Sequence, residues 1–272
     1  IKHRYNLMKR NKILFSLLFG VAFLLSGCDV EVDEKDRLVD VEIPTAGRNV
    51  LIEDFTGQAC INCPKASDII EDLQKTYGAD TVIAVGRHSG PFGFAGNAKY
   101  PVGLKTALGD TYYKHWGIEH QPQGMVNRQG RVEYFDWAAR VKSAINQTAP
   151  LELVVNATYD ATAGKAAVEI TAQSVKEATT GKLQVWIVED DIVAMQLFPN
   201  RKVEEAYHHH HVFRDAVNGD FGTDFTVAVG EVKHEKFDYA LQSSWRVENL
   251  WLVAFVYNDS GVQQVVRKKL IP

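Results

Sequence analysis

The hydrophobic pattern of this chain changes at Pro150, and the change restricts the folds that the sequence can adopt. Between residues 48 and 147, apolar runs of strand length alternate with segments that carry one apolar helical stripe. After Pro150, short β-type runs follow one another, and turn residues separate most of them. The pattern therefore predicts an α/β domain over residues 47–149. It predicts an all-β, sandwich-like domain of the immunoglobulin or jelly-roll type over residues 150–272.

The same pattern predicts the individual elements. The first domain is expected in the order strand, helix, strand, helix, strand, strand, helix. Its strands are predicted at Arg48–Phe55, Thr81–Arg87, Gly124–Asn127 and Arg131–Phe135, and its helices at Pro64–Tyr77, Leu104–Trp116 and Trp137–Asn146. Strands of the second domain are predicted at Leu151–Tyr159, Ala166–Ala172, Leu183–Glu189, Phe225–Val229, Lys233–Ala240 and Leu250–Tyr257. A helical segment around residues 201–217 can interrupt this series.

A pair of cysteines, Cys60 and Cys63, ends the loop after the first predicted strand and opens the first predicted helix. A helix N-terminus carries partial positive charge and free N–H groups, and both stabilise a thiolate. We therefore expect the first Cys to have a lowered pKa and to act as a nucleophile. Two intervening residues bring the sulfur atoms within bonding distance. Cys60 can then attack a substrate disulfide, and Cys63 can resolve the mixed disulfide.

Three other kinds of site could contain this Cys pair. A zinc site needs two further Cys or His ligands at a suitable spacing, and the sequence has no second Cys pair. A c-type haem site needs His directly after the second Cys, where this chain has Pro64. A permanent structural disulfide stays open as an alternative, although a bond that closes so short a loop adds little stability. We expect no metal and no small-molecule cofactor, because the dithiol would itself be the redox group.

The segment Val50–Cys63 resembles the active-site segment of thioredoxins, and the predicted order of elements is similar to theirs. The resemblance implies that Asp54, six residues before the first Cys, is a buried proton acceptor. It also implies a cis peptide before Pro122, where a substrate strand would dock, because cis bonds are essentially confined to residues before proline. The alternatives are a polar strand end at Asp54 and an ordinary trans proline at Pro122. The inner pair Ile61-Asn62 and the following Pro64 depart from the thioredoxin pattern, which leaves the direction of electron flow open.

The N-terminal segment has the organisation of an export signal. Basic residues at positions 9, 10 and 12 precede the apolar run Ile13–Leu25, which is shorter than the roughly 20 residues of a membrane span. The sequence Leu-Ser-Gly-Cys ending at Cys28 resembles the lipobox of bacterial lipoproteins, in which the Cys carries a lipid and becomes the N-terminus. We expect residues 1–27 to be the signal peptide, with residues 1–7 before the natural start at Met8. An ordinary signal peptide or a short membrane anchor is the alternative.

Export has consequences for the rest of the chain. Residues 28–46 are polar and acidic, and such a segment cannot bury enough apolar surface to fold, so we expect a tether. Outside the cytoplasm, Cys60 and Cys63 can form a lasting disulfide. The net charge of −4 gives no electrostatic reason to expect nucleic-acid binding.

Several separate segments point to one family. They are Thr56-Gly57 with the Cys pair and Pro64, Met125–Arg128, Tyr207–Arg214 and Val253–Asn258. Together they resemble the Bacteroidetes-type outer-membrane lipoproteins related to the twenty-eight-kilodalton outer-membrane protein. The resemblance implies a thioredoxin-like domain joined to a β-rich C-terminal domain, and an outer-membrane location on the periplasmic or the surface side. It implies no defined activity.

The run His208–His211 is a further candidate site. Adjacent side chains of a strand point to opposite faces, and in a helix only His208 and His211 share a face, so at most two imidazoles can converge on a metal ion. A structural or exposed cluster is therefore expected. A structural role is also expected for His88, which ends the second predicted strand.

The sequence thus favours an exported, lipid-anchored thiol–disulfide oxidoreductase. Cys60 would be the nucleophile, Cys63 the resolving thiol, Asp54 the proton acceptor and Pro122 the docking point for a substrate strand. Its partners would be the thiols and disulfides of other exported proteins, or surface ligands. The alternative is a non-enzymatic binding lipoprotein of the outer membrane or cell surface, in which the Cys pair is a structural disulfide.

Overall fold

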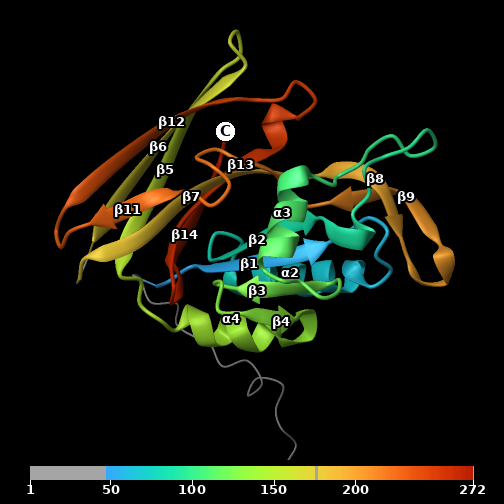
Figure 1. Cartoon of the computed structure of the whole chain (residues 1–272), viewed down its shortest axis with the longest axis horizontal. Coiled ribbons are helices and arrows are strands. Elements are labelled where there is room, and N and C mark those ends of the chain that lie inside the picture. Colours follow the sequence, from blue (N-terminus) through green and yellow to red (C-terminus); the bar gives the residue numbers. More distant parts are fainter. Residues whose placement is uncertain (1–46, 175–176, 272) are drawn as a thin grey trace, which may run out of the picture. The chain divides into compact units, whose positions relative to one another are not determined.

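The computed structural model describes residues 47–174 and 177–271 of the chain (Figure 1). The expected signal peptide and the whole of the expected tether, which begins at the expected lipid-bearing Cys28, lie outside these described residues. Within the two described ranges, every helix is too short or too polar to cross a membrane.

One sheet of nine strands dominates the fold. Four of its strands precede Pro150: β1 (Val50–Thr56), β2 (Val82–His88), β3 (Gln123–Val126) and β4 (Arg131–Glu133). Five follow it: β7 (Thr179–Glu189), β10 (Val212–Ala216), β11 (Thr223–Val227), β13 (Leu250–Asn258) and β14 (Gly261–Lys269). The order is β14-β13-β7-β10-β2-β1-β3-β4, and β11 pairs with β7. The two groups meet where β10 runs parallel to β2, at Val212 and Gly86.

This architecture shows that the expected fold class is wrong. Strands make up 47% of the structure and helices 20%, so the chain is mostly β rather than an α/β thioredoxin-like domain followed by a separate sandwich. The error has a physical cause. Residues 185–188 of β7 are apolar and buried on both faces, and such a run fits the middle of a mixed sheet as well as a sandwich core. Hydrophobic pattern identifies the strand but not the strands beside it.

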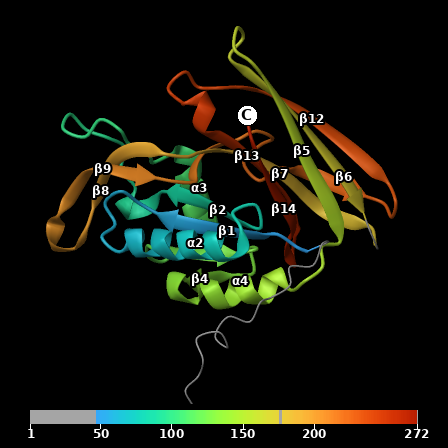
Figure 2. The ribbon, with the colours of Figure 1, turned by 180° about the vertical axis from the view of Figure 1, so that it is seen from behind.

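Three helices cover the two faces of the first strands. α2 (Cys63–Tyr77) buries a stripe that includes Ala66, Ile70 and Leu73, and it contacts β2 and α4 (Trp137–Ile145). α4 contacts β1 and β3, so both helices lie on one face of the sheet (Figure 2). α3 (Ala107–His115) lies on the other face, where its fully buried Tyr112 packs among the rings of Trp186, Phe213 and Phe221.

Two smaller sheets complete the fold. β5 (Leu151–Asp160), β6 (Lys165–Ser174) and β12 (Val232–Ala240) form a three-stranded sheet in the order β12-β6-β5. Buried and exposed residues alternate along β5, and its buried side chains share a core with Leu183 and Val185 of β7. β8 (Ile192–Leu197) and β9 (Val203–His209) form a hairpin. The helical segment expected around residues 201–217 is therefore wrong, because these residues belong largely to β9 and β10.

Candidate functional site

The two cysteines form a disulfide at the start of α2, with their Cα atoms 5.4 Å apart. β1 leads into a tight turn, in which the backbone N–H of Cys60 donates to the carbonyl of Gly57 at 3.0 Å. A Cβ atom on Gly57 would lie 2.2 Å from the carbonyl oxygen of Phe92, so only glycine fits this turn. Cys60 and Cys63 are each only 2% exposed. Residue Ile61, between them, is 43% exposed.

The β8–β9 hairpin is bonded to the loop that carries the disulfide. The side-chain amide of Gln196 donates to the carbonyl of Cys60 at 2.9 Å. The backbone N–H of Leu197 donates to the carbonyl of Gln58 at 2.8 Å, and the amide of Gln58 donates to the carbonyl of Met195 at 3.1 Å. Gln58 is fully buried. These contacts hold the Cys loop against a hairpin that lies more than 130 positions later in the sequence.

Asp54 lies in β1 and is 2% exposed. Burial raises the pKa of its carboxyl to about 7, against a smaller opposing effect of Arg87. Its Oδ1 atom has no hydrogen-bond partner within the described part of the chain. The resemblance to thioredoxins implied a buried carboxyl at this position, and Asp54 is buried. Its role in proton transfer stays a prediction.

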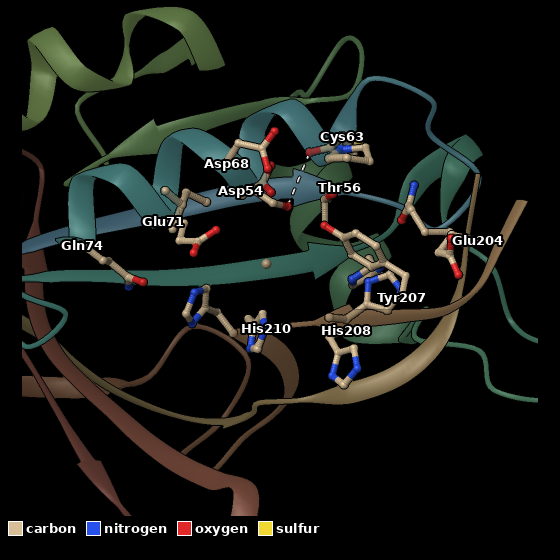
Figure 3. Close-up of a pocket in the computed structure, with 18 of the residues that line it drawn as sticks. Asp54, Thr56, Cys63, Asp68, Glu71, Gln74, Glu204, Tyr207, His208 and His210 are labelled. Atoms are coloured by element: carbon tan, nitrogen blue, oxygen red, sulfur yellow. Dashed lines mark hydrogen bonds between the residues drawn. The ribbon is translucent and has the colours of Figure 1, made fainter. Parts of the chain in front are cut away.

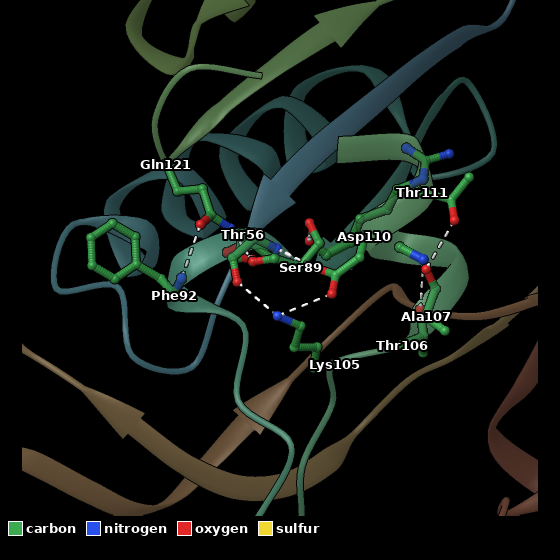
Figure 4. Close-up of polar contacts among 12 residues, drawn as sticks. Thr56, Ser89, Phe92, Lys105, Thr106, Ala107, Asp110, Thr111 and Gln121 are labelled. Atoms are coloured by element: carbon green, nitrogen blue, oxygen red, sulfur yellow. Dashed lines mark hydrogen bonds and ion pairs between the residues drawn. The ribbon is translucent and has the colours of Figure 1, made fainter. Parts of the chain in front are cut away.

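The peptide bond between Gln121 and Pro122 is cis. The amide of Gln121 donates to the carbonyl oxygens of Thr56 and Ser89, and its Oε1 accepts from the N–H of Phe92 (Figure 4). Gln121 thereby ties the segment before Pro122 to the ends of β1 and β2. The docking of a substrate strand at Pro122 stays a prediction.

A cavity of about 610 Å³ lies between α2 and β9 (Figure 3). Asp54, Cys63 and His88 are among the residues of its wall on the side of β1, β2 and α2. On the other side, the wall includes Tyr207 and His209 of β9. The cavity therefore brings together two predicted site residues, Cys63 and Asp54, and the His run, and it also includes His88, for which a structural role was expected.

Two of the cavity histidines are buried and uncharged. The rings of His88 and His209 meet edge to face, with their centroids 5.1 Å apart. Burial lowers the pKa of His88 well below its ordinary value, and His209 and Arg214 lower it further. Burial likewise lowers the pKa of His209 to about 4. Both imidazoles are therefore neutral near pH 7.

The remaining histidines of the run make different contacts. Nδ1 of His208 lies 2.5 Å from a carboxylate oxygen of Asp191, and Nδ1 of His211 lies 3.3 Å from one of Asp190. His210 is exposed. Across residues 47–174 and 177–271, no three His, Cys, Asp or Glu side chains are placed to hold a metal ion together.

A buried charge cluster on the other face of β1 was not predicted from the sequence. Glu53, fully buried, forms ion pairs with Arg87 at 2.8 Å and with Arg128 at 2.7 Å. Burial would raise the pKa of Glu53, but the two arginines outweigh it and lower the pKa. In the sequence, Glu53 is visible as a charged residue inside an apolar strand run. The sequence does not show which residues form ion pairs with it.

A comparison with protein-family models identifies the family of this chain through residues 109–272. The family model for the outer membrane protein Omp28 matches residues 109–272. The chain belongs to the Omp28 family. The match confirms the predicted relation to the twenty-eight-kilodalton outer-membrane protein and the predicted outer-membrane location, whereas the Bacteroidetes lipoprotein type stays a prediction. The matched range begins after the disulfide, so membership in the Omp28 family leaves the chemistry of Cys60 and Cys63 open.

Solved structures resemble this Omp28-family chain to different extents. HBP35 of Porphyromonas gingivalis is 18% identical, with a TM-score of 0.64 over 82% of this chain and 76% of that one. A protein from Agrobacterium tumefaciens is 16% identical, with a TM-score of 0.51 over 81% of this chain and 94% of that one. At these identities the likeness concerns the fold alone. A domain of the outer membrane lipoprotein Omp28 from Porphyromonas gingivalis is 28% identical over 45% of this chain and 88% of that one, with a TM-score of 0.34. No curated protein matches the chain.

Proposed function

We propose that this Omp28-family chain is a non-catalytic binding lipoprotein of the outer membrane, in which Cys60–Cys63 is a structural disulfide. The observation that carries the proposal is the covering of the disulfide. Both cysteines are 2% exposed, and Gln196 of β8 is bonded to the carbonyl of Cys60. Exchange requires a thiolate to reach a sulfur atom of the disulfide. A disulfide covered in this way is protected from a protein substrate while the hairpin stays in place.

The cavity between α2 and β9 is the proposed binding site. Its volume of about 610 Å³ lies within the roughly 300–1,000 Å³ that is usual for small-molecule sites. The disulfide lies in its wall through Cys63, where it fixes the start of α2 against the loop after β1. In this proposal the disulfide stabilises one side of the binding site.

Lipid attachment at Cys28 is the second part of the proposal. The support is the apolar run Ile13–Leu25 with the lipobox-like residues that follow it. Growth of a host with an alkyne-tagged fatty acid should label the wild-type chain and leave Cys28→Ala unlabelled. Equal labelling of both would show that the anchor is elsewhere or absent.

Thiol–disulfide exchange is the second candidate function, and one observation favours it. Asp54 borders the same cavity as Cys63, and burial raises its pKa to about 7. A carboxyl with a pKa near the ambient pH can accept and return a proton. In this candidate, opening of the β8–β9 hairpin would have to precede every exchange.

Disulfide reactivity separates the two functions. For the binding protein we expect no reduction of insulin and a reduction potential below about −300 mV, as is typical of structural disulfides. Gln196→Ala should make reduction by dithiothreitol faster, because one contact of the covering hairpin is lost. Insulin reduction by the wild type that Cys60→Ser abolishes, with a potential between about −120 and −270 mV, would refute the proposal and establish exchange.

A further inference from the structure

The cavity between α2 and β9 is lined by acidic side chains and by no Lys or Arg among the described residues. Its walls contain four carboxyl side chains, those of Asp54, Asp68, Glu71 and Glu204. Asp68 and Glu71 lie on α2, and Glu204 lies on the facing strand β9 (Figure 3). Carboxylates on both walls attract a cation into the space between them.

Two residues of the cavity wall, Asp54 and His88, each have a buried polar atom without a partner among the described residues. These atoms are Oδ1 of Asp54 and Nδ1 of His88. The two residues are 2% and 5% exposed. A buried polar atom without a partner is unfavourable, so a ligand that donates a hydrogen bond to these side chains would recover free energy. The neutral imidazole of His88 can act as an acceptor at one ring nitrogen.

The wall also offers apolar surface beside these polar atoms. Ile70 and Pro64 of α2 border the cavity, and the ring of Tyr207 borders it from β9. A Tyr ring attracts a cation over its face, and apolar side chains accommodate methylene groups. The cavity therefore combines acceptors with a surface suited to a short alkyl chain.

We infer that this cavity binds an alkylammonium group, either of a free polyamine or of a lysine side chain. The inference rests on the proposed binding function and names the ligand class of that site. An ammonium group has three donors and no acceptor, which suits the unpartnered atoms of Asp54 and His88. An anion would meet carboxylates on both walls. A metal ion would lack a third protein ligand among the residues that the structure describes.

Calorimetry with cadaverine tests the inference, with 1,5-pentanediol as its uncharged counterpart. The oxidised mature chain is used at pH 8, above the pKa of about 7 of Asp54. Cadaverine should bind at least about 10-fold more tightly than the diol, because hydrogen bonds to charged groups are stronger than those between neutral groups. Nα-acetyl-lysine methylamide serves as the second probe. Binding of both amines would indicate a protein partner with a lysine, and binding of cadaverine alone would indicate a free polyamine.

Matched variants locate the ligand. Asp54→Asn should weaken cadaverine binding at least about 10-fold. Asp72→Asn should leave binding within about 2-fold, because Asp72 is an exposed carboxylate of α2 that does not border the cavity. If Asp54→Asn does not fold, Glu204→Gln on the exposed rim should weaken binding about 2-fold to 5-fold.

Two results would overturn the inference. One is equal affinity for cadaverine and the diol, and the other is unchanged cadaverine binding in folded Asp54→Asn. Failure of the proposed function would look different. In that case insulin would be reduced in a Cys60-dependent manner while the cavity could still bind cadaverine.

Discussion

The buried carboxyl of Asp54 should make the stability of the fold depend on pH in a distinctive way. Burial raises its pKa from the ordinary value of 3.8 to about 7. The folded chain therefore holds this proton more tightly than the unfolded chain does. The associated stability is present at pH values below about 4 and is lost as the pH rises to about 7. Above pH 7 the folded protein carries the full cost of a buried carboxylate.

The size of this effect follows from the pKa values. One pKa unit corresponds to 1.36 kcal/mol, so a rise from 3.8 to about 7 corresponds to roughly 4 kcal/mol. Asp54→Asn keeps the shape of the side chain but removes its ionisation. We therefore expect the free energy of unfolding of Asp54→Asn, relative to wild type, to increase by roughly 4 kcal/mol between pH 4 and pH 8.

Urea denaturation of the oxidised proteins at pH 4, 5, 6, 7 and 8 measures this difference. The comparison between wild type and Asp54→Asn removes the contributions of the other titrating groups, because both proteins share them. Asp72→Asn is the control, since Asp72 has a side chain that is 79% exposed. A difference that stays constant with pH, or that falls as the pH rises, would refute the argument from burial.

Three other substitutions test the rest of the structure by the same denaturation assay. Glu53→Gln leaves two buried arginines without a counter-charge and should destabilise the fold by about 3–5 kcal/mol, and a loss below 1 kcal/mol would contradict the ion-pair geometry. Asn127→Ala removes the side-chain acceptor for the N–H of Leu51, 2.8 Å away, and should cost about 1–3 kcal/mol. Gly57→Ala places a Cβ atom 2.2 Å from the carbonyl of Phe92 and should cost about 1–3 kcal/mol, so a neutral effect would show that the turn is free to move.

Local features of the fold could be predicted because their causes are local. The stripe of Ala66, Ile70 and Leu73 predicts α2, and Pro64 suits its first turn, where the missing N–H costs nothing. The burial of Asp54 was implied by the resemblance of Val50–Cys63 to the thioredoxin active-site segment, and Asp54 is 2% exposed.

The arrangement of the strands could not be predicted in the same way. β10 pairs with β2 through residues that are more than 120 positions apart, and neither strand has a composition that specifies its neighbour. The hydrogen bond between Gln196 and Cys60 could not be predicted either, because a glutamine in a short strand is usually expected to be exposed. Pairing depends on which buried surfaces complement each other in three dimensions, and a single sequence pattern does not contain that information.

The buried charge cluster explains why the two groups of strands form one sheet. Glu53, Arg87 and Arg128 all precede Pro150, whereas many of the rings around the two guanidinium groups follow it. The guanidinium carbon of Arg87 lies 4.2 Å from the ring centroid of Trp186, and that of Arg128 lies 4.1 Å from the ring centroid of Tyr257.

Burying two cations against one carboxylate is costly, and aromatic faces offset part of the cost. Without the later strands, these arginines would lose their aromatic partners and β2 would become an unpaired edge. The charges of the first group and the rings of the second therefore stabilise the fold only when they are brought together. This mutual dependence favours a single mixed sheet over two independent layers.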